Sequence, residues 1–136
     1  MSYWLFKSEP NVFSIDDLMH AKQQTSCWDG VRNYQVRNML RDQIKKGDLA
    51  FFYHSSCSPP GIVGVMRIVK DGYLEPQQST WYSVDVQFVQ KFPRLLSLDE
   101  IKKHITLKKM LVARKGNRLS ITPVTQEEWG EVFQLI

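Results

Sequence analysis

Four stretches of the chain combine polar and aromatic residues in ways that could hold a ligand. The first is Lys7-Ser8, which ends an apolar segment and precedes Glu9-Pro10. Side chains leave a sheet at strand ends, so Lys7 could supply a positive charge and Ser8 a hydrogen-bond donor and acceptor. A surface turn ended by proline is the alternative interpretation.

The second stretch runs from Cys27 to Tyr34, just before an expected helix. Backbone amides at a helix start favour an anion such as phosphate. The side-chain amide of Asn33 presents the donor and acceptor that read a base edge. Asn33 could equally be the N-cap of the helix, and Trp28 could be a core residue. The residues alone leave both interpretations open.

The third stretch is an aromatic segment ending in Tyr53-His54-Ser55. Strand alternation places Tyr53 and Ser55 on one face and His54 on the other. His54 and Cys57 could be drawn as a base and a nucleophile. The sequence indicates no third group to orient them, so a structural role for His54 is favoured.

The fourth stretch is the start of a later strand at Trp81, whose indole can close a pocket as readily as it covers a core. Further along, a loose basic cluster could follow a phosphate backbone, although a solvated charged face is the commoner case. The cluster comprises Lys108, Lys109, Arg114, Lys115 and Arg118.

Motifs for other chemistries are absent from the sequence. Glu9 and Asp29 are the only acids within the aromatic stretches, and nothing in the sequence pairs them. There is no glycine-rich phosphate loop and no His-Glu-x-x-His motif. Cys27 and Cys57 do not form a Cys-x-x-Cys pair, so neither a zinc site nor a disulfide framework is indicated. No cofactor or metal is expected.

Helix and strand patterns alternate along the chain. N-caps at Ser14, Ser97 and Thr125, each with an acid three residues later, predict three helix starts. A stripe of apolar residues predicts a further helix over 34–46. Expected strands cover residues 3–7, 49–55, 61–70 with a turn at Asp71-Gly72, 82–89, and a hairpin of 110–113 with 118–121.

The totals describe an ordinary globular chain. It has 136 residues, 43% hydrophobic and 24% charged, and is expected to form one domain over 1–136. The elements predict an α+β fold, a curled mixed sheet or small barrel of five or six strands flanked by three or four short helices. A net charge of +4 mildly favours an anionic partner. No signal-peptide pattern or membrane-spanning run is present, so a soluble, cytoplasmic protein is expected. The sequence does not fix the oligomeric state.

The same stretches, in the same order, resemble the EVE domain family. The segments that carry the resemblance are Tyr3–Pro10, Trp28–Tyr34 with Arg37-Asn38, Gly47-Asp48 with Phe51–Ser55, Gly61–Gly64, and Arg118–Ser120 before Pro123-Val124. The resemblance implies a PUA-like fold related to PUA, ASCH and YTH domains, and a nuclear location if the source is eukaryotic. It also implies a pocket for a modified base of DNA or RNA. In the remotely similar YTH domains, a Lys-Ser at a strand end and aromatic side chains enclose a methylated base.

Together, the residues and the resemblance predict a non-enzymatic module that holds one nucleic-acid base in an aromatic pocket. Trp28, with Trp81 as a second wall, is expected to sandwich the base, while Lys7, Arg32 and Arg37 hold flanking phosphates. The rivals are a nucleotide-directed hydrolase or nuclease using Glu9, Asp29 and His54, and a peptide-binding module. The expected binding residues are Lys7, Ser8, Trp28, Arg32, Asn33, Tyr34, Arg37, Tyr53, His54, Ser55, Trp81 and Arg118.

Overall fold

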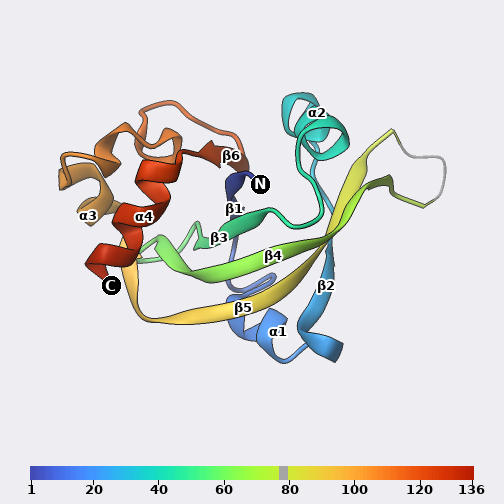
Figure 1. Ribbon diagram of the computed structural model, residues 1–136, viewed down its shortest axis with the longest axis horizontal. Coiled ribbons are helices and arrows are strands. Elements are labelled where there is room, and N and C mark those ends of the chain that lie inside the picture. Colours follow the sequence, from blue (N-terminus) through green and yellow to red (C-terminus); the bar gives the residue numbers. More distant parts are fainter. Residues whose placement is uncertain (77–79) are drawn as a thin grey trace.

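A curled, mixed sheet organises the chain (Figure 1). The computed structural model describes residues 1–76 and 80–136. Within them, six strands lie in the order β2-β5-β4-β3-β1-β6. β1 and β3 are parallel and the other neighbours are antiparallel. The strands are β1 (Tyr3–Ser8), β2 (Thr25–Trp28), β3 (Leu49–His54), β4 (Gly61–Leu74), β5 (Tyr82–Ser97) and β6 (Ile121–Val124).

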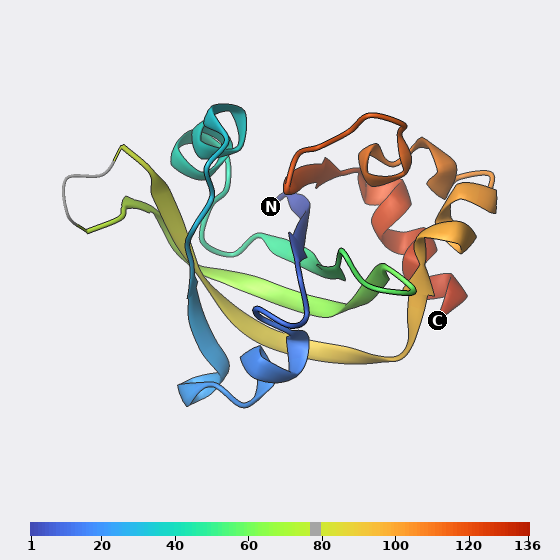
Figure 2. The ribbon, with the colours of Figure 1, turned by 180° about the vertical axis from the view of Figure 1, so that it is seen from behind.

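Short helices cover the two ends of the sheet (Figures 1 and 2). Helices α3 and α4 lie with β6 at one end, and α1 and α2 lie near β2 at the other. The described residues form α1 (Ile15–Met19), α2 (Tyr34–Asp42), α3 (Leu98–Lys103) and α4 (Gln126–Leu135), with 3-10 turns η1 (Lys22–Gln24), η2 (Leu107–Lys109) and η3 (Leu111–Ala113). The expected α+β architecture is confirmed. None of the described helices is long and apolar enough to cross a membrane.

The three helix starts expected from capping patterns are confirmed. Ser14, Ser97 and Thr125 each occupy the N-cap and accept a hydrogen bond from the backbone amide three residues on. At Ser14 and Thr125 the acid at the third position closes a capping box. These bonds satisfy amides that a helix leaves unpaired, so the boundaries were readable from local sequence.

Among residues 1–76 and 80–136, two hydrophobic clusters form the core. The first cluster includes Phe6, Trp28 and Phe52, and the second includes Phe51 and Tyr53. Neighbouring residues of β3 thus enter different clusters because successive strand side chains point to opposite faces. Both faces of the sheet therefore carry apolar side chains, and the helices and turns pack against them.

Asp48 fastens the start of β1 to the start of β3. Its carboxylate accepts hydrogen bonds from the amide of Ser2 (2.9 Å), the indole of Trp4 (3.0 Å) and the amide of Lys45 (3.0 Å). The side chain is buried, and three donors compensate for the loss of water around its charge. This arrangement fixes the register of the two parallel strands.

The expected hairpin of 110–113 with 118–121 is wrong. Residues 111–113 form η3, and Ile121–Val124 pair with β1 instead. Asn117 holds the loop between them, since its side chain donates to the carbonyl of Leu111 (2.6 Å) and accepts from the amide of Leu119 (2.9 Å). β6 lies at the edge of the sheet, where Pro123, which lacks an amide hydrogen, is tolerated.

The turn expected at Asp71-Gly72 is also wrong, because β4 continues to Leu74. A side chain at Gly72 would collide with the backbone carbonyl of Leu40, so the glycine permits close packing of α2 on β4.

The bounds of other elements also differ from those expected. α2 ends at Asp42, not at residue 46, β5 extends to Ser97, and β2 was not expected.

Candidate functional site

A cavity of about 470 Å³ lies between β1 and β2. Among the described strands, β2 pairs with β5, and β1 pairs with β3 and β6. The edges of the sheet are β2 and β6, so the curled sheet stays open between β2 and the β1–β6 pair, and side chains fill part of the gap. The volume falls in the range of roughly 300–1,000 Å³ that small-ligand sites occupy. The lining residues are Lys7, Ser8, Val12, Phe13, Ser26, Cys27, Trp28 and Asp29.

Trp28 is both a core residue and a wall of this cavity. Its indole meets the rings of Phe6, Phe52 and Phe13 edge-on, with centroids 5.2, 5.4 and 6.2 Å away. Only 8% of the residue is exposed. The indole thus joins the two strands that hydrogen bonds do not connect, while its remaining surface faces the cavity.

A tight turn after β1 brings Phe13 over the cavity. The amides of Val12 and Phe13 both donate to the carbonyl of Glu9 at 2.9 Å. The hydroxyl of Ser8 donates to the carbonyl of Phe13 at 2.6 Å. The hydroxyl hydrogen of Ser8 is therefore engaged, and its oxygen retains lone pairs that can accept a hydrogen bond from a ligand.

Charged groups complete the lining. Lys7 is half-buried, and burial lowers the pKa of its ammonium. Its backbone amide donates to the carbonyl of Ser120 at 2.8 Å, which fixes the end of β1. Asp29 is exposed where β2 ends. The cavity thus offers a cationic donor, a hydroxyl acceptor and a carboxylate beside two aromatic rings.

Several expected binding residues have structural partners outside the cavity. Asn33 is the N-cap of α2 and accepts from the amide of Val36 at 3.0 Å. Tyr53 faces the second core cluster, where burial raises the pKa of its phenol to about 12. The amide of Ser55 donates to the carbonyl of Ser8 at 3.0 Å. Asn33 and Tyr53 therefore stabilise the fold, while the backbone hydrogen bond from Ser55 fixes the position of Ser8.

A second aromatic group lies beside the start of α2. The rings of Tyr34 and Trp81 stack with centroids 4.8 Å apart. The guanidinium of Arg32 lies 5.2 Å from the Trp81 ring, and that of Arg37 lies 5.1 Å from the Tyr34 ring. None of these four residues lines the cavity. The structure therefore does not bring Trp81 to the cavity wall that Trp28 forms.

Arg32 is neutralised by a neighbour. Its guanidinium donates to both carboxylate oxygens of Glu75, at 2.9 and 3.1 Å. This hydrogen bonding lowers the pKa of the Glu75 carboxyl. The amide of Gly30 also donates to Glu75 at 3.2 Å. Arg32 and Glu75 thus hold the loop between β2 and α2, so Arg32 is less available to a phosphate than Lys7.

The residues of the rival hydrolase do not converge on the cavity. Asp29 lines it, whereas Glu9 and His54 do not. The Nε2 atom of His54 accepts from the amide of Ile15 at 3.1 Å, and burial lowers the pKa of the imidazole. A general base needs that lone pair for a substrate proton. In the described part of the chain, no three His, Cys, Asp or Glu side chains cluster to hold a metal.

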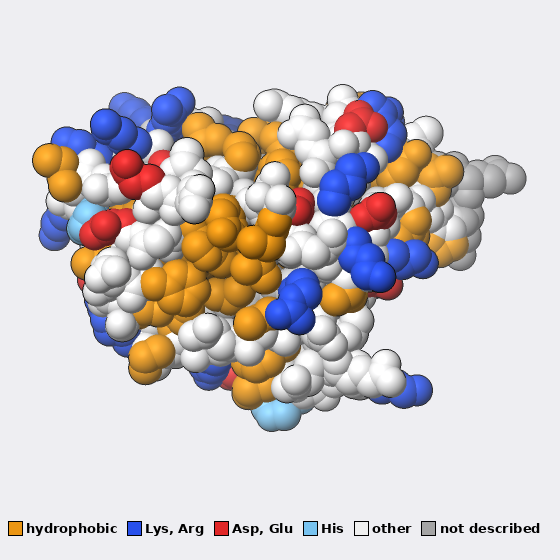
Figure 3. All heavy atoms as spheres, in the orientation of Figure 1, with side chains coloured by type: hydrophobic (Ala, Val, Ile, Leu, Met, Phe, Trp, Pro, Cys, Tyr) orange, Lys and Arg blue, Asp and Glu red, His pale blue; other side chains and the backbone are white. Residues whose placement is uncertain are grey.

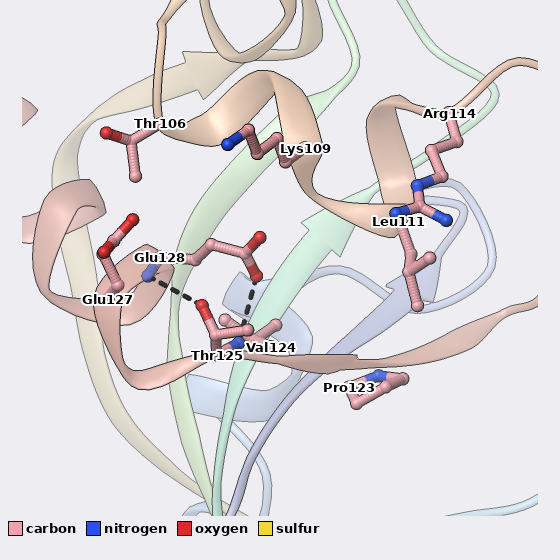
Figure 4. Close-up of a pocket in the computed structure, with 9 residues that line it drawn as sticks. All are labelled: Thr106, Lys109, Leu111, Arg114, Pro123, Val124, Thr125, Glu127 and Glu128. Atoms are coloured by element: carbon pink, nitrogen blue, oxygen red, sulfur yellow. Dashed lines mark hydrogen bonds between the residues drawn. The ribbon is translucent and has the colours of Figure 1, made fainter.

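A larger cavity of about 590 Å³ lies near the start of α4 (Figure 4). Its described lining contains no aromatic ring, and the carboxylate of Glu128 within it accepts from the amide of Thr125 at 3.0 Å. Lys109 and Arg114 stand on one side of it and Glu127 on the other. This cavity therefore lacks a surface on which a base can stack.

Three cavity residues lie outside every stretch chosen from the sequence: Val12, Phe13 and Ser26. Cys27 lies in the second stretch, but no binding role was expected for it. No binding role was expected for Phe13, and no strand was expected at 25–28. The available signal was the position of Phe13, which lies between Ser8 and the Ser14 cap. A turn as short as the one from Ser8 to Phe13 brings Phe13 back beside the end of β1.

The chain belongs to the EVE domain family, whose model matches residues 2–135. It is 42% identical to thymocyte nuclear protein 1 of Rattus norvegicus over 98% of this chain and 73% of the relative. Two of the similar solved structures are each 42% identical to this chain. A Pseudomonas syringae protein superposes with a TM-score of 0.90, covering 98% of this chain and 99% of that one. Human THYN1 protein in complex with 5-methylcytosine-containing DNA superposes with a TM-score of 0.88, covering 99% and 97%. The resemblance and the PUA-like curled sheet expected from the sequence are confirmed.

Proposed function

We propose that this chain binds nucleic acid and holds one modified base in the cavity between β1 and β2. The observation that carries the proposal is this cavity, lined by Lys7, Ser8 and Trp28, in a chain 42% identical to a human protein solved with methylated DNA. A base inside a duplex cannot reach such a cavity, so the target base is flipped out or lies in a single strand.

The polar lining suits the edge of a base. The ammonium of Lys7 donates to a carbonyl or ring nitrogen, and the Ser8 oxygen accepts from a base N–H. The carboxylate of Asp29 accepts from an exocyclic amine, as acidic side chains do with cytosine. Phe13 replaces Trp81 as the second aromatic wall, since it meets Trp28 at the cavity.

The apolar lining suits a methyl substituent. Burying one methyl group beside Trp28 and Phe13 stabilises the complex by about 1 kcal/mol, roughly a fivefold preference. Stacking on an aromatic ring adds about 1–3 kcal/mol for any base. The module therefore discriminates modestly between methylated and unmodified bases, unless a second polar group of the modification is also bound. Binding is the whole of the proposed activity, and no bond of the ligand is made or broken.

A cavity-filling variant tests this proposal without emptying the core. Ser26 lines the cavity and lies two residues before Trp28 on β2, so its side chain leaves the same face of the strand. Ser26→Trp therefore places a large ring where the base would lie. We expect it to abolish the preference for a 5-methylcytosine oligonucleotide over an unmodified one, measured by fluorescence anisotropy at fixed salt. The matched control is Ser58→Trp, because Ser58 is exposed in the loop after β3, outside the cavity.

The two variants must first give the same circular dichroism spectrum and melting temperature as the natural chain. Equal preference for methylated oligonucleotide in all three proteins would contradict the proposed site. Turnover of an oligonucleotide that stops in His54→Gln would favour the hydrolase instead. Failure of nucleosides to compete with a bound peptide would favour the peptide-binding alternative.

A further inference from the structure

The basic side chains of the chain are distributed unevenly. Residues 102–118, called here the cationic segment, contain seven Lys and Arg, and no Asp or Glu occurs between 101 and 126. The rest of the chain carries eleven basic and fourteen acidic residues, so it is net negative. The seven are Lys102, Lys103, Lys108, Lys109, Arg114, Lys115 and Arg118.

These side chains face solvent and gather over α3 and the turns that follow it (Figure 3, upper left). In the described part of the chain, none of the seven takes part in an ion pair. Elsewhere, Arg32, Arg41, Lys91 and Arg94 each pair with an acid. Charges left uncompensated on one face attract an anionic partner, and the rest of the molecule repels it.

The fold holds this face rigidly. Leu107, Met110 and Val112 are buried in the second core cluster, so the cations between and after them are turned outward. Asn117 bridges the loop by donating to the Leu111 carbonyl (2.6 Å) and accepting from the Leu119 amide (2.9 Å). A prearranged face loses less side-chain and loop entropy on binding than a flexible tail would.

The cationic segment leads directly to the cavity between β1 and β2. Arg118 lies two residues before Ser120, whose carbonyl accepts from the amide of Lys7 at 2.8 Å. Leu119 packs against the core cluster that contains Trp28. A nucleic-acid strand whose base lies beside Lys7 would therefore meet the segment first at its last cation, Arg118.

The carboxylates of α4 beside this face are largely engaged within the protein. Glu128 accepts from the amide of Thr125 at 3.0 Å, and Glu131 pairs with His104 at 3.2 Å. Glu127 faces Lys109 across the larger cavity (Figure 4). That cavity is of mixed charge and does not itself suit an anion, whereas the exposed cations outside it do.

We propose that the cationic segment binds backbone phosphates of the nucleic acid whose base occupies the cavity. This inference rests on the proposed function and assigns the segment a separate task. Phosphate contacts add affinity and orientation without reading sequence. The segment therefore strengthens binding to methylated and unmodified duplexes by the same factor.

The test neutralises four cations of the segment together: Lys108→Gln, Lys109→Gln, Arg114→Gln and Lys115→Gln. We expect duplex binding to weaken roughly tenfold or more at low salt, equally for a duplex with one 5-methylcytosine and its unmodified counterpart. The slope of log affinity against log salt should fall by about 0.9 for each phosphate that the variant no longer neutralises. Binding of free 5-methyl-2′-deoxycytidine should not change.

The matched control removes the same charge from exposed positions elsewhere, by Lys22→Gln, Lys45→Gln, Lys46→Gln and Arg67→Gln. Its salt slope should stay close to that of the natural chain. Equal slopes in both variants would overturn the role of the segment while leaving the base cavity intact. Loss of methyl preference in Ser26→Trp, with unmodified duplex still bound through the segment, would support both proposals.

Two further results would also overturn the inference. Binding of the free nucleoside with no binding of either duplex would leave the cavity as a nucleoside site and the segment without a phosphate partner. Retention of the natural chain on phosphatidylserine vesicles at physiological salt, again without duplex binding, would assign this face to a membrane surface.

Discussion

At the residue scale, His54 shows how a side chain suited to catalysis is used to join elements. Its Nε2 atom accepts from the amide of Ile15, the first residue of α1 (3.1 Å), and its ring contacts Phe52 edge-on. Protonation would place a donor opposite that amide. Burial lowers the pKa of His54, so the folded protein resists protonation that the unfolded chain accepts freely.

A pH dependence of stability follows from this lowered pKa. Between the ordinary value of about 6.5 and the lower folded value, the unfolded chain binds more protons, so the unfolding free energy rises with pH. We expect stability to fall as pH drops from 7.5 to 5, and to fall less in His54→Gln, whose side-chain oxygen can still accept from Ile15. Urea unfolding at each pH, followed by tryptophan fluorescence, measures this.

The control for that prediction is His20→Gln, because His20 is exposed. It should keep the acid sensitivity of the natural chain. If His54→Gln and the natural chain lost stability in parallel, another group would be responsible for the pH dependence.

At the element scale, the packing of α2 on β4 depends on one missing side chain. A Cβ at Gly72 would collide with the carbonyl of Leu40 in α2, a backbone atom that cannot move alone. We expect Gly72→Ala to lower the unfolding free energy by about 1–3 kcal/mol, as overpacked contacts do. Gly130→Ala is the control, since Gly130 lies in α4 with open space around it and alanine favours helix. Destabilisation of both variants by the same amount would show that close packing is not the cause.

Local patterns predicted the elements better than their pairing. The caps at Ser14, Ser97 and Thr125 were correct because capping uses residues within four positions of each other. Gly72 was misread as part of a turn because the need for glycine arises from α2, about thirty residues away in the chain. The mistaken hairpin has the same origin, since Ile121 pairs with Phe6 of a distant strand. Long-range pairing leaves little trace in one sequence.

In the candidate site, too, local motifs could be predicted from the sequence, whereas long-range contacts could not. Lys7, Ser8 and Trp28 were picked from compact motifs, and the structure brings all three to one cavity. Phe13 lines the cavity and Trp81 does not, because which ring reaches the cavity depends on how the sheet curls. The sequence shows which residues are aromatic, whereas the topology of the sheet determines which of those rings line the cavity.

At the scale of the whole molecule, the sheet is closed by side chains at the place where the ligand is proposed to bind. β1 and β2 share no hydrogen bonds in the described structure, and Trp28 spans the gap to Phe6 and Phe52. A fully hydrogen-bonded barrel would leave no opening there. The cavity therefore lies at the place where the sheet lacks hydrogen bonds between neighbouring strands.

This arrangement predicts that Trp28 contributes more to stability than Trp81, which lies outside the cavity. Trp28→Ala removes the ring that joins the two strands and leaves a hole in the first core cluster, so we expect the unfolding free energy to fall by about 3–5 kcal/mol. Trp81→Ala is the matched comparison. Its ring stacks on the exposed Tyr34, and losing such a stack costs about 0.5–1.5 kcal/mol beyond the buried area. Urea unfolding followed by far-ultraviolet circular dichroism measures both variants without relying on tryptophan fluorescence. If Trp28→Ala were no less stable than Trp81→Ala, the indole of Trp28 would not be what closes the sheet, and the cavity would need another wall.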